Sequence, residues 1–212
     1  MTGLVTSNFY SMQGNIKLSL MIALPIALVP FLLGDASMIP MIVAIQIFVF
    51  ASNTGTSLKM DESSKWNKFE ITLPVTRTAI VSAKYVSFML LILLGLATSL
   101  VTVLLQSIRG ELSFDLLFSG YSFGLQLSLM TIGIVYPLIL KLGAEKSETL
   151  LFAAAGLSVA LRFLLWYLLH LSDATIDFRS SEVDRVSLMV ALAIFAASYA
   201  VSVMMYRSKE LH

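Results

Sequence analysis

The chain alternates between long apolar runs and short polar connections. Each run is about 20 residues long or longer, the length that a helix needs to cross the roughly 30 Å hydrocarbon core of a bilayer. This pattern predicts an all-α integral membrane protein with six transmembrane helices, forming a single domain over residues 1–212. The predicted spans are residues 17–34, 38–58, 79–106, 121–140, 149–171 and 187–206.

Residues 1–15, which precede the first apolar run, have a mixed composition. Their apolar side chains recur near helical spacing and are separated by polar ones, at Leu4, Val5, Phe9 and Met12. This spacing favours a short amphipathic helix lying at the membrane surface, with a frayed tail as the alternative. Pro25 and Pro30 interrupt the run that follows, so the first span is expected to be kinked or partly broken.

Composition supports the membrane assignment and narrows the chemistry. Of the 212 residues, 58% are hydrophobic and 13% are charged, against about 25% charged in soluble domains. The chain has no cysteine, and its two histidines are far apart, so we expect no metal site. A net charge of +1 gives no reason to expect a nucleic-acid partner. The N-terminal residues lack the basic region of a signal peptide.

Basic residues are distributed unequally between the two sides of the predicted bundle. Ten of the 14 lie at the N-terminus, in the 59–78 loop or just beyond it at Lys84, in the 141–148 loop or at the C-terminus, while Arg109, Arg179 and Arg185 lie on the other side. Positive charge in short loops marks the cytoplasmic side. The sequence therefore predicts a multi-pass membrane protein with both termini in the cytoplasm.

The 59–78 loop is the one long polar segment between spans. Asp61 and Glu62 suit a helix N-terminus, and Trp66, Phe69 and Leu73 follow at the spacing of one helix face. A short amphipathic helix over residues 61–73, ended by a proline, is therefore expected. One interpretation is an interfacial helix with its tryptophan among the lipid headgroups. The other is a rigid docking element for a cytoplasmic partner.

Three segments of this region resemble the cytoplasmic-loop signature of small ABC-2-type permeases: DESSKWNKFE at 61–70, LPVTR at 73–77 and VSAKY at 81–85. These permeases are membrane subunits of bacterial ABC exporters, with about six spans and no fused ATPase, so the resemblance implies the plasma membrane of a bacterium. The family includes exporters of phenol-soluble modulins and related amphipathic peptides. The matching positions are the acidic pair, Ser64, Trp66, the Leu-Pro pair, Arg77 and the Lys-Tyr pair.

The resemblance implies a function and a set of partners. The 61–73 segment would be a coupling helix seated on a separate cytoplasmic ABC ATPase, which would bind the ATP and Mg²⁺. A second permease copy or a paralogue would complete the pump, and a hydrophobic or amphipathic substrate, most simply a peptide, would move outward. The residues implied in ATPase coupling are Asp61, Glu62, Lys65, Trp66, Lys68, Phe69, Leu73 and Arg77.

Other functions remain open at this point. The same machinery would serve immunity if it expelled antimicrobial peptides from the membrane. The chain would alternatively be a non-transporting anchor or sensor, or a channel that works without ATP. It has no G-x-x-x-x-G-K-[ST] motif and no acid/base or nucleophile arrangement, so we do not expect it to be an enzyme by itself. Arg77 and Lys84 are either positive-inside anchors or form salt bridges with the ATPase or the N-terminal helix.

Three polar residues within spans are candidates for a substrate route. Arg162 lies deep in the fifth predicted span, where a charge is costly and usually faces the bundle interior or a wet cavity. Asn53 and Gln46 lie in the second span. The alternative for all three is structural, with Arg162 paired to another span and the two amides tying helices together. In the outer loop 172–186, the four acidic residues Asp173, Asp177, Glu182 and Asp184 are expected to be solvated.

Overall fold

The computed structural model describes residues 2–70, 72, 74–110 and 113–208, and short connections apart, these residues are helical. Within these ranges there is no β-strand. The helices are α1 (Thr2–Leu33), the 3-10 helix η1 (Ala36–Met38), α2 (Ile39–Ser63), α3 (Trp66–Glu70), α4 (Arg77–Arg109), α5 (Phe114–Leu142), α6 (Ser147–Ser172) and α7 (Ser181–Ser208).

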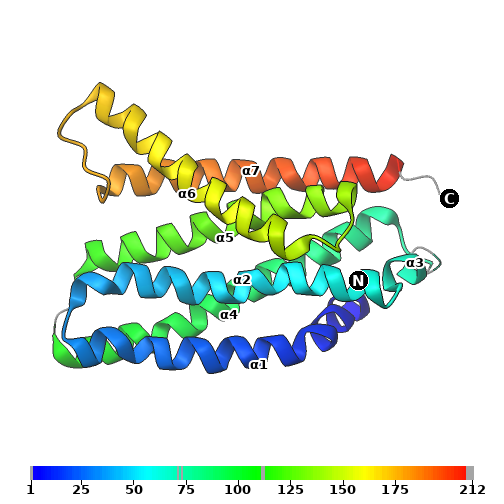
Figure 1. The fold of residues 1–212 in the computed structure, drawn as a ribbon, viewed down its shortest axis with the longest axis horizontal. Coiled ribbons are helices and arrows are strands. Elements are labelled where there is room, and N and C mark those ends of the chain that lie inside the picture. Colours follow the sequence, from blue (N-terminus) through cyan, green and yellow to red (C-terminus); the bar gives the residue numbers. More distant parts are fainter. Residues whose placement is uncertain (1, 71, 73, 111–112, 209–212) are drawn as a thin grey trace.

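Six helices of the described chain are long and apolar enough to cross a membrane: α1, α2 together with η1, α4, α5, α6 and α7. They lie side by side, and their connections alternate between the two ends of the bundle (Figure 1). The predicted all-α, six-span fold is confirmed. The short helix α3 lies outside the bundle at the end toward which both termini lie (Figure 1).

The first helix differs from its prediction. The segment expected as a separate interfacial helix and the first span form one continuous helix, α1, which passes through both Pro25 and Pro30. The N-terminal part of α1 bends away from the axis of the remainder (Figure 1). Asn8 and Met12 in this part are buried against the protein. This part of α1 therefore packs on the protein through Asn8 and Met12, while Tyr10, which is 75% exposed, faces outward.

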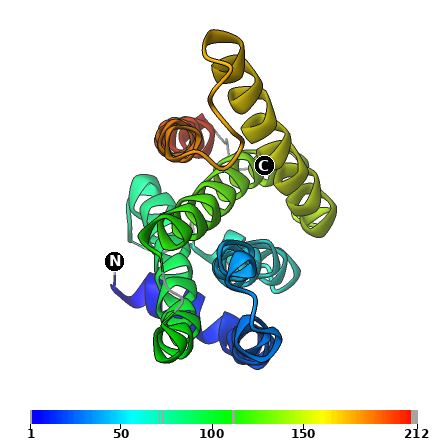
Figure 2. The same cartoon turned by 90° about the vertical axis from the view of Figure 1, so that its left-hand side faces the viewer.

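The bundle is organised around α5. In the end-on view, α5 lies between the group α1, α2 and α4 and the pair α6 and α7 (Figure 2). Within its most apolar stretch 61% of α5 is buried, against 17% for α7 and 22% for both α1 and α6. The peripheral helices therefore offer broad apolar faces to the surroundings, as a protein in lipid requires.

Glycine allows α2 to approach its neighbours closely. A Cβ atom on Gly95 of α4 would lie 2.8 Å from the Cα of Ile47, and one on Gly120 of α5 would lie 2.9 Å from the Cα of Pro40. Small residues allow this close contact between helices in membranes, where burial of apolar surface gives little drive for association. The contacts fix α2 between α4 and α5, and so determine where its polar end emerges.

Candidate functional site

The polar connection between α2 and α4 contains two helical pieces where the sequence predicts one. Asp61 and Glu62 belong to the last turn of α2, which ends at Ser63. The Ser64 hydroxyl donates to the Met60 carbonyl at 2.7 Å, and Lys65 has φ 56°, a left-handed conformation that stops a helix. The predicted 61–73 helix is thus shorter, because α3 covers only Trp66–Glu70.

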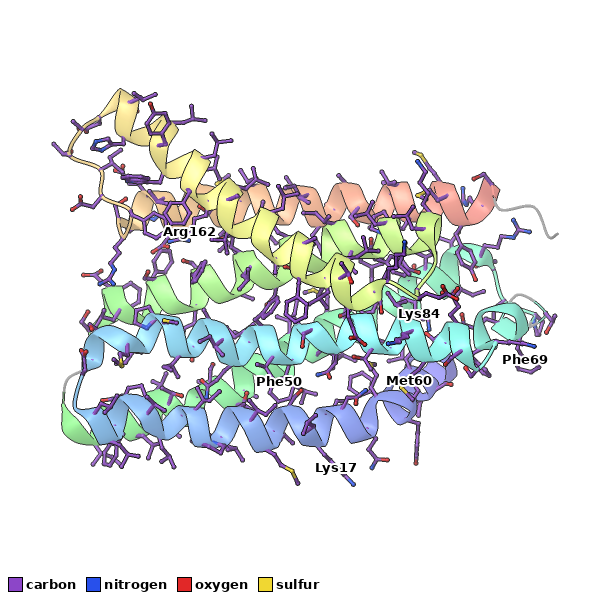
Figure 3. All side chains as sticks on the ribbon, in the orientation of Figure 1. Lys17, Phe50, Met60, Phe69, Lys84 and Arg162 are labelled. Carbon is purple, nitrogen blue, oxygen red and sulfur yellow. The ribbon has the colours of Figure 1, made fainter. Side chains whose placement is uncertain are left out.

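The two aromatic residues of α3 have different environments. The Trp66 indole N–H donates to Glu70 Oε1 at 2.6 Å, and the side chain is half-buried. The Phe69 ring, 5.3 Å from the Trp66 ring, is 53% exposed. Phe69 lies at the tip of the α2–α4 connection (Figure 3). The outward-facing aromatic residue of α3 is therefore Phe69, whereas Trp66 is held by the protein itself.

A buried lysine connects this region to the spans. Lys84, in the second turn of α4, is 4% exposed. Its ammonium group donates to Asp61 Oδ2 of α2 at 2.6 Å and to Asn8 Oδ1 of α1 at 2.7 Å, and it lies 3.4 Å from Glu70 Oε1 of α3. The Asn8 amide in turn donates to Ser87 Oγ at 3.1 Å. We call Asn8, Asp61, Glu70 and Lys84 the Lys84 cluster; it joins four helices.

The charges of the Lys84 cluster depend on one another. Two carboxylates share one ammonium group, and both acids are buried. Burial raises the pKa of the Glu70 carboxyl; the Lys84 ammonium opposes this effect, the Asp61 charge adds to it, and the Trp66 N–H opposes it. Charges removed from water in this way are tolerated only when paired. The cluster therefore has to form as a unit.

From its sequence position, Lys84 was expected to be an anchor or to form a salt bridge with the ATPase or the N-terminal helix. In the structure its salt bridges go to Asp61 of α2 and Glu70 of α3, and its contact with the N-terminal helix is the hydrogen bond to Asn8. A signal was present, because Lys84 falls well inside the predicted third span, where a charge needs a partner. Nothing in the sequence shows which residues pair with Lys84.

The remaining predicted coupling residues form other contacts at this end. The Glu62 carboxylate accepts from the Ala144 amide in the α5–α6 connection. The Arg77 guanidinium donates to the Arg207 carbonyl of α7 at 2.8 Å. Lys65 is exposed. The side chain of Lys68 and all of Leu73 lie outside the described residues.

The three candidates for a substrate route lie in two separate helix contacts. Gln46 donates to the Ala23 carbonyl and accepts from Thr102, both at 2.9 Å, and Asn53 donates to Ser19 Oγ at 2.8 Å. These bonds tie α2 to α1 and α4. Arg162 lies in α6, a different helix from the one that carries the two amides. It also lies toward the opposite end of the bundle from Lys84 (Figure 3).

Arg162 is 3% exposed and pairs with Asp184 of α7 at 2.5 Å. Its guanidinium carbon also lies 4.9 Å and 5.2 Å from the ring centres of Phe123 and Phe178. The expectation that Asp184 is solvated was wrong: it lies in the first turn of α7 and is 1% exposed. The sequence placed this residue in a loop because the helix begins earlier than its apolar run does.

In the part of the chain that the structure describes, no group of three histidine, aspartate or glutamate side chains is arranged to hold a metal ion. The polar contacts at this end join the small helix α3 to the bundle: Glu70 of α3 pairs with Lys84 of α4, and Lys84 in turn contacts α1 and α2. The fold thus defines a multi-pass helical membrane protein with one structured polar end.

Comparison with known families shows to which family the chain belongs. The sequence profile of the family described as ABC-2 family transporter protein matches residues 3–207, and the chain belongs to that family. Permeases of this family generally work with a cytoplasmic ABC ATPase and are typically not catalytic themselves. Neither the curated proteins nor the solved structures contain a significant match to the chain.

Proposed function

We propose that the chain is the membrane-spanning subunit of an ABC exporter, driven by a separate cytoplasmic ATPase that docks on α3. The observation that carries this proposal is the two-sided character of α3. Glu70 is buried within the Lys84 cluster, and Phe69 faces away from the protein with 53% of its surface exposed. An exposed aromatic side chain on a fixed helix suits the centre of a protein interface.

The proposed mechanism uses the chain's own contacts. ATP and Mg²⁺ would be bound and hydrolysed by the partner, since the sequence has no phosphate-binding motif. Closure of two ATPases would displace α3 in each of two permease copies or paralogues. Because packed helices move as rigid units, this displacement would rock the spans between two arrangements and release the substrate outward.

The proposed cargo is a hydrophobic or amphipathic molecule, most simply a peptide, as the sequence resemblance implies. The peripheral helices support this proposal in a general way. On α1, Leu24, Leu28 and Leu32 are between 42% and 73% exposed and lie at four-residue intervals, so they form a continuous apolar strip. Such a strip suits contact with lipid or with a second permease copy, beside which an amphipathic cargo would move.

Copurification tests the docking proposal. We expect a cytoplasmic ABC ATPase of the source cells to copurify with the chain from detergent, and Phe69→Ala to weaken that association by about 2 kcal/mol or more, about 30-fold. Phe152→Ala is the matched control. Phe152 is also a phenylalanine on the surface, 72% exposed, but it belongs to the spanning helix α6 and not to α3. Equal ATPase recovery with Phe69→Ala and wild type would contradict docking on this face.

Transport has to be measured separately from docking. We expect the purified complex in lipid vesicles to move a fluorescent amphipathic peptide only when ATP is present. Docking without any ATP-dependent movement of peptide, lipid or small hydrophobic dyes would instead indicate an anchor or sensor subunit. Protection of cells from antimicrobial peptides, without secretion of a peptide of their own, would indicate an immunity transporter.

A further inference from the structure

The short helix α3 cannot hold its own position. It has five residues, and helices of this length are unstable in water because nucleation costs more than so few hydrogen bonds return. Pro74 and the left-handed Lys65 flank it, so it does not continue either neighbouring helix. Its position relative to the spans must therefore come from side-chain contacts.

Glu70 provides such a contact at the last residue of α3. It is 2% exposed, its Oε1 lies 3.4 Å from Lys84 Nζ, and the same oxygen accepts from the Trp66 indole. The carboxylate therefore connects the aromatic side chain of α3 with the ammonium group of α4. The contact is polar and directional, so it specifies an orientation more narrowly than apolar packing does.

Lys84 extends this contact to two further helices. Its bonds to Asp61 and Asn8 are 2.6 and 2.7 Å long and come from α2 and α1. The side-chain exposures of Lys84, Asp61 and Glu70 are 5%, 9% and 3%. Water is therefore largely excluded, and no partner can leave without stranding a buried charge.

We infer that Lys84 is the positioning residue of α3: it fixes the helix to α1, α2 and α4 at once, so that displacement of α3 moves these three spans together. The structural part of this inference stands on the geometry alone. Its consequence for transport rests on the proposed function. The two parts are tested by different measurements.

The structural part can be tested on the permease without any ATPase. The chain has no cysteine, so spin labels can be attached at Thr72→Cys, beside α3, and Lys141→Cys, in the last turn of α5. Both positions are exposed. We expect a narrow distribution of distances between the labels in the otherwise unchanged chain and a distinctly broader one with Lys84→Met.

Controls keep this test decisive. Lys59→Met removes a lysine at the same end whose ion pair with Glu148 is exposed, and it should leave the distribution narrow. If Lys84→Met fails to fold, the neutral triple variant Asp61→Asn/Glu70→Gln/Lys84→Met leaves no buried charge stranded and should still broaden the distribution. A narrow distribution in that triple variant would overturn the inference, because apolar packing alone would then position α3.

The functional part is tested in the complex with the ATPase. In complexes that still contain the ATPase, we expect the neutral triple variant to transport about 5- to 150-fold less substrate per ATP hydrolysed, the usual range of coupling between sites. If the ATPase fails to bind even the wild-type chain, the proposed function fails while the label result stands. If the ATPase binds and transport per ATP is unchanged, the inference about coupling fails and the proposed function stands.

Discussion

At the scale of single residues, charge pairing determines where polar side chains lie in this protein. Arg162 and Asp184 are buried together between α6 and α7, with the rings of Phe123 and Phe178 beside the guanidinium. Each charge compensates the other in surroundings that would tolerate neither alone. This pair agrees with the structural interpretation of Arg162, and a role of Arg162 in a substrate route stays a prediction.

Removing one member of this pair should be more harmful than removing both. Arg162→Leu or Asp184→Leu alone should lower the free energy of unfolding by about 3–5 kcal/mol, because the remaining charge is buried without a partner. The double variant Arg162→Met/Asp184→Leu should be much closer to the wild type. Thermal unfolding in detergent measures all three.

The exposed pair of Lys59 and Glu148 provides the control for this comparison. Its side chains are 48% and 67% exposed, so alanine at either position should leave the unfolding temperature unchanged. A double variant at 162 and 184 that loses as much stability as the two single variants together would show that charge compensation is not what holds these residues.

At the scale of secondary-structure elements, close helix contacts and chain breaks fix the positions of α2 and α3. Gly95 and Gly120 allow α2 to lie against the backbones of α4 and α5. The left-handed Lys65 then separates α3 from α2 and turns it across the end of the bundle. The same residues in a single straight helix would point Asp61 and Glu70 in different directions.

The contact at Gly95 can be tested with one methyl group. Gly95→Ala places a Cβ 2.8 Å from the Ile47 Cα, and the backbone has to shift to accommodate it. We expect a loss of about 1–3 kcal/mol in the free energy of unfolding, as for other overpacked contacts. Gly14→Ala is the control, since a Cβ there has no neighbour within 4 Å.

The control should change the free energy of unfolding in the opposite direction to Gly95→Ala, or not at all. Gly14 lies inside α1, where alanine favours the helix over glycine by up to about 1 kcal/mol. Gly14→Ala should therefore be neutral or slightly stabilising when unfolding is followed in detergent. A Gly95→Ala variant as stable as Gly14→Ala would show that α2 and α4 do not pack this closely.

At the scale of the whole molecule, basic residues gather at the end of the bundle that carries α3. The α5–α6 connection lies at this end and the α6–α7 connection at the other (Figure 1). The first contains Lys146, and the second contains Thr175, which is exposed. The charge distribution predicts that the α3 end faces the cytoplasm.

Labelling of single cysteines tests this orientation. On intact cells, a membrane-impermeant maleimide should react with Thr175→Cys and not with Lys146→Cys, because the first position is expected outside and the second inside. After the cells are permeabilised, both should react. The absence of native cysteine makes the unmodified chain the background control. Labelling of Lys146→Cys on intact cells would reverse the predicted topology.

The sequence by itself determined the number and type of spanning helices and the family. Spanning a bilayer is a local property: about 20 consecutive apolar residues satisfy their own backbone hydrogen bonds as a helix, whatever surrounds them. The loop motif containing Trp66 and Lys84 led to the ABC-2 family, which the family comparison confirms. The docking role of the loop, and the cargo, remain predictions.

Only the tertiary structure decided which residues meet. Lys84 contacts Asp61 and Asn8, which are 23 and 76 positions away in the chain, and no local pattern specifies contacts of that range. The orientation of α3 depends on the same contacts, so the inward position of Trp66 and the outward position of Phe69 do not follow from their shared helical spacing. The hydropathy of a segment, which the sequence gives directly, indicates whether that segment favours lipid. The pairing of buried charges depends instead on how the folded helices pack.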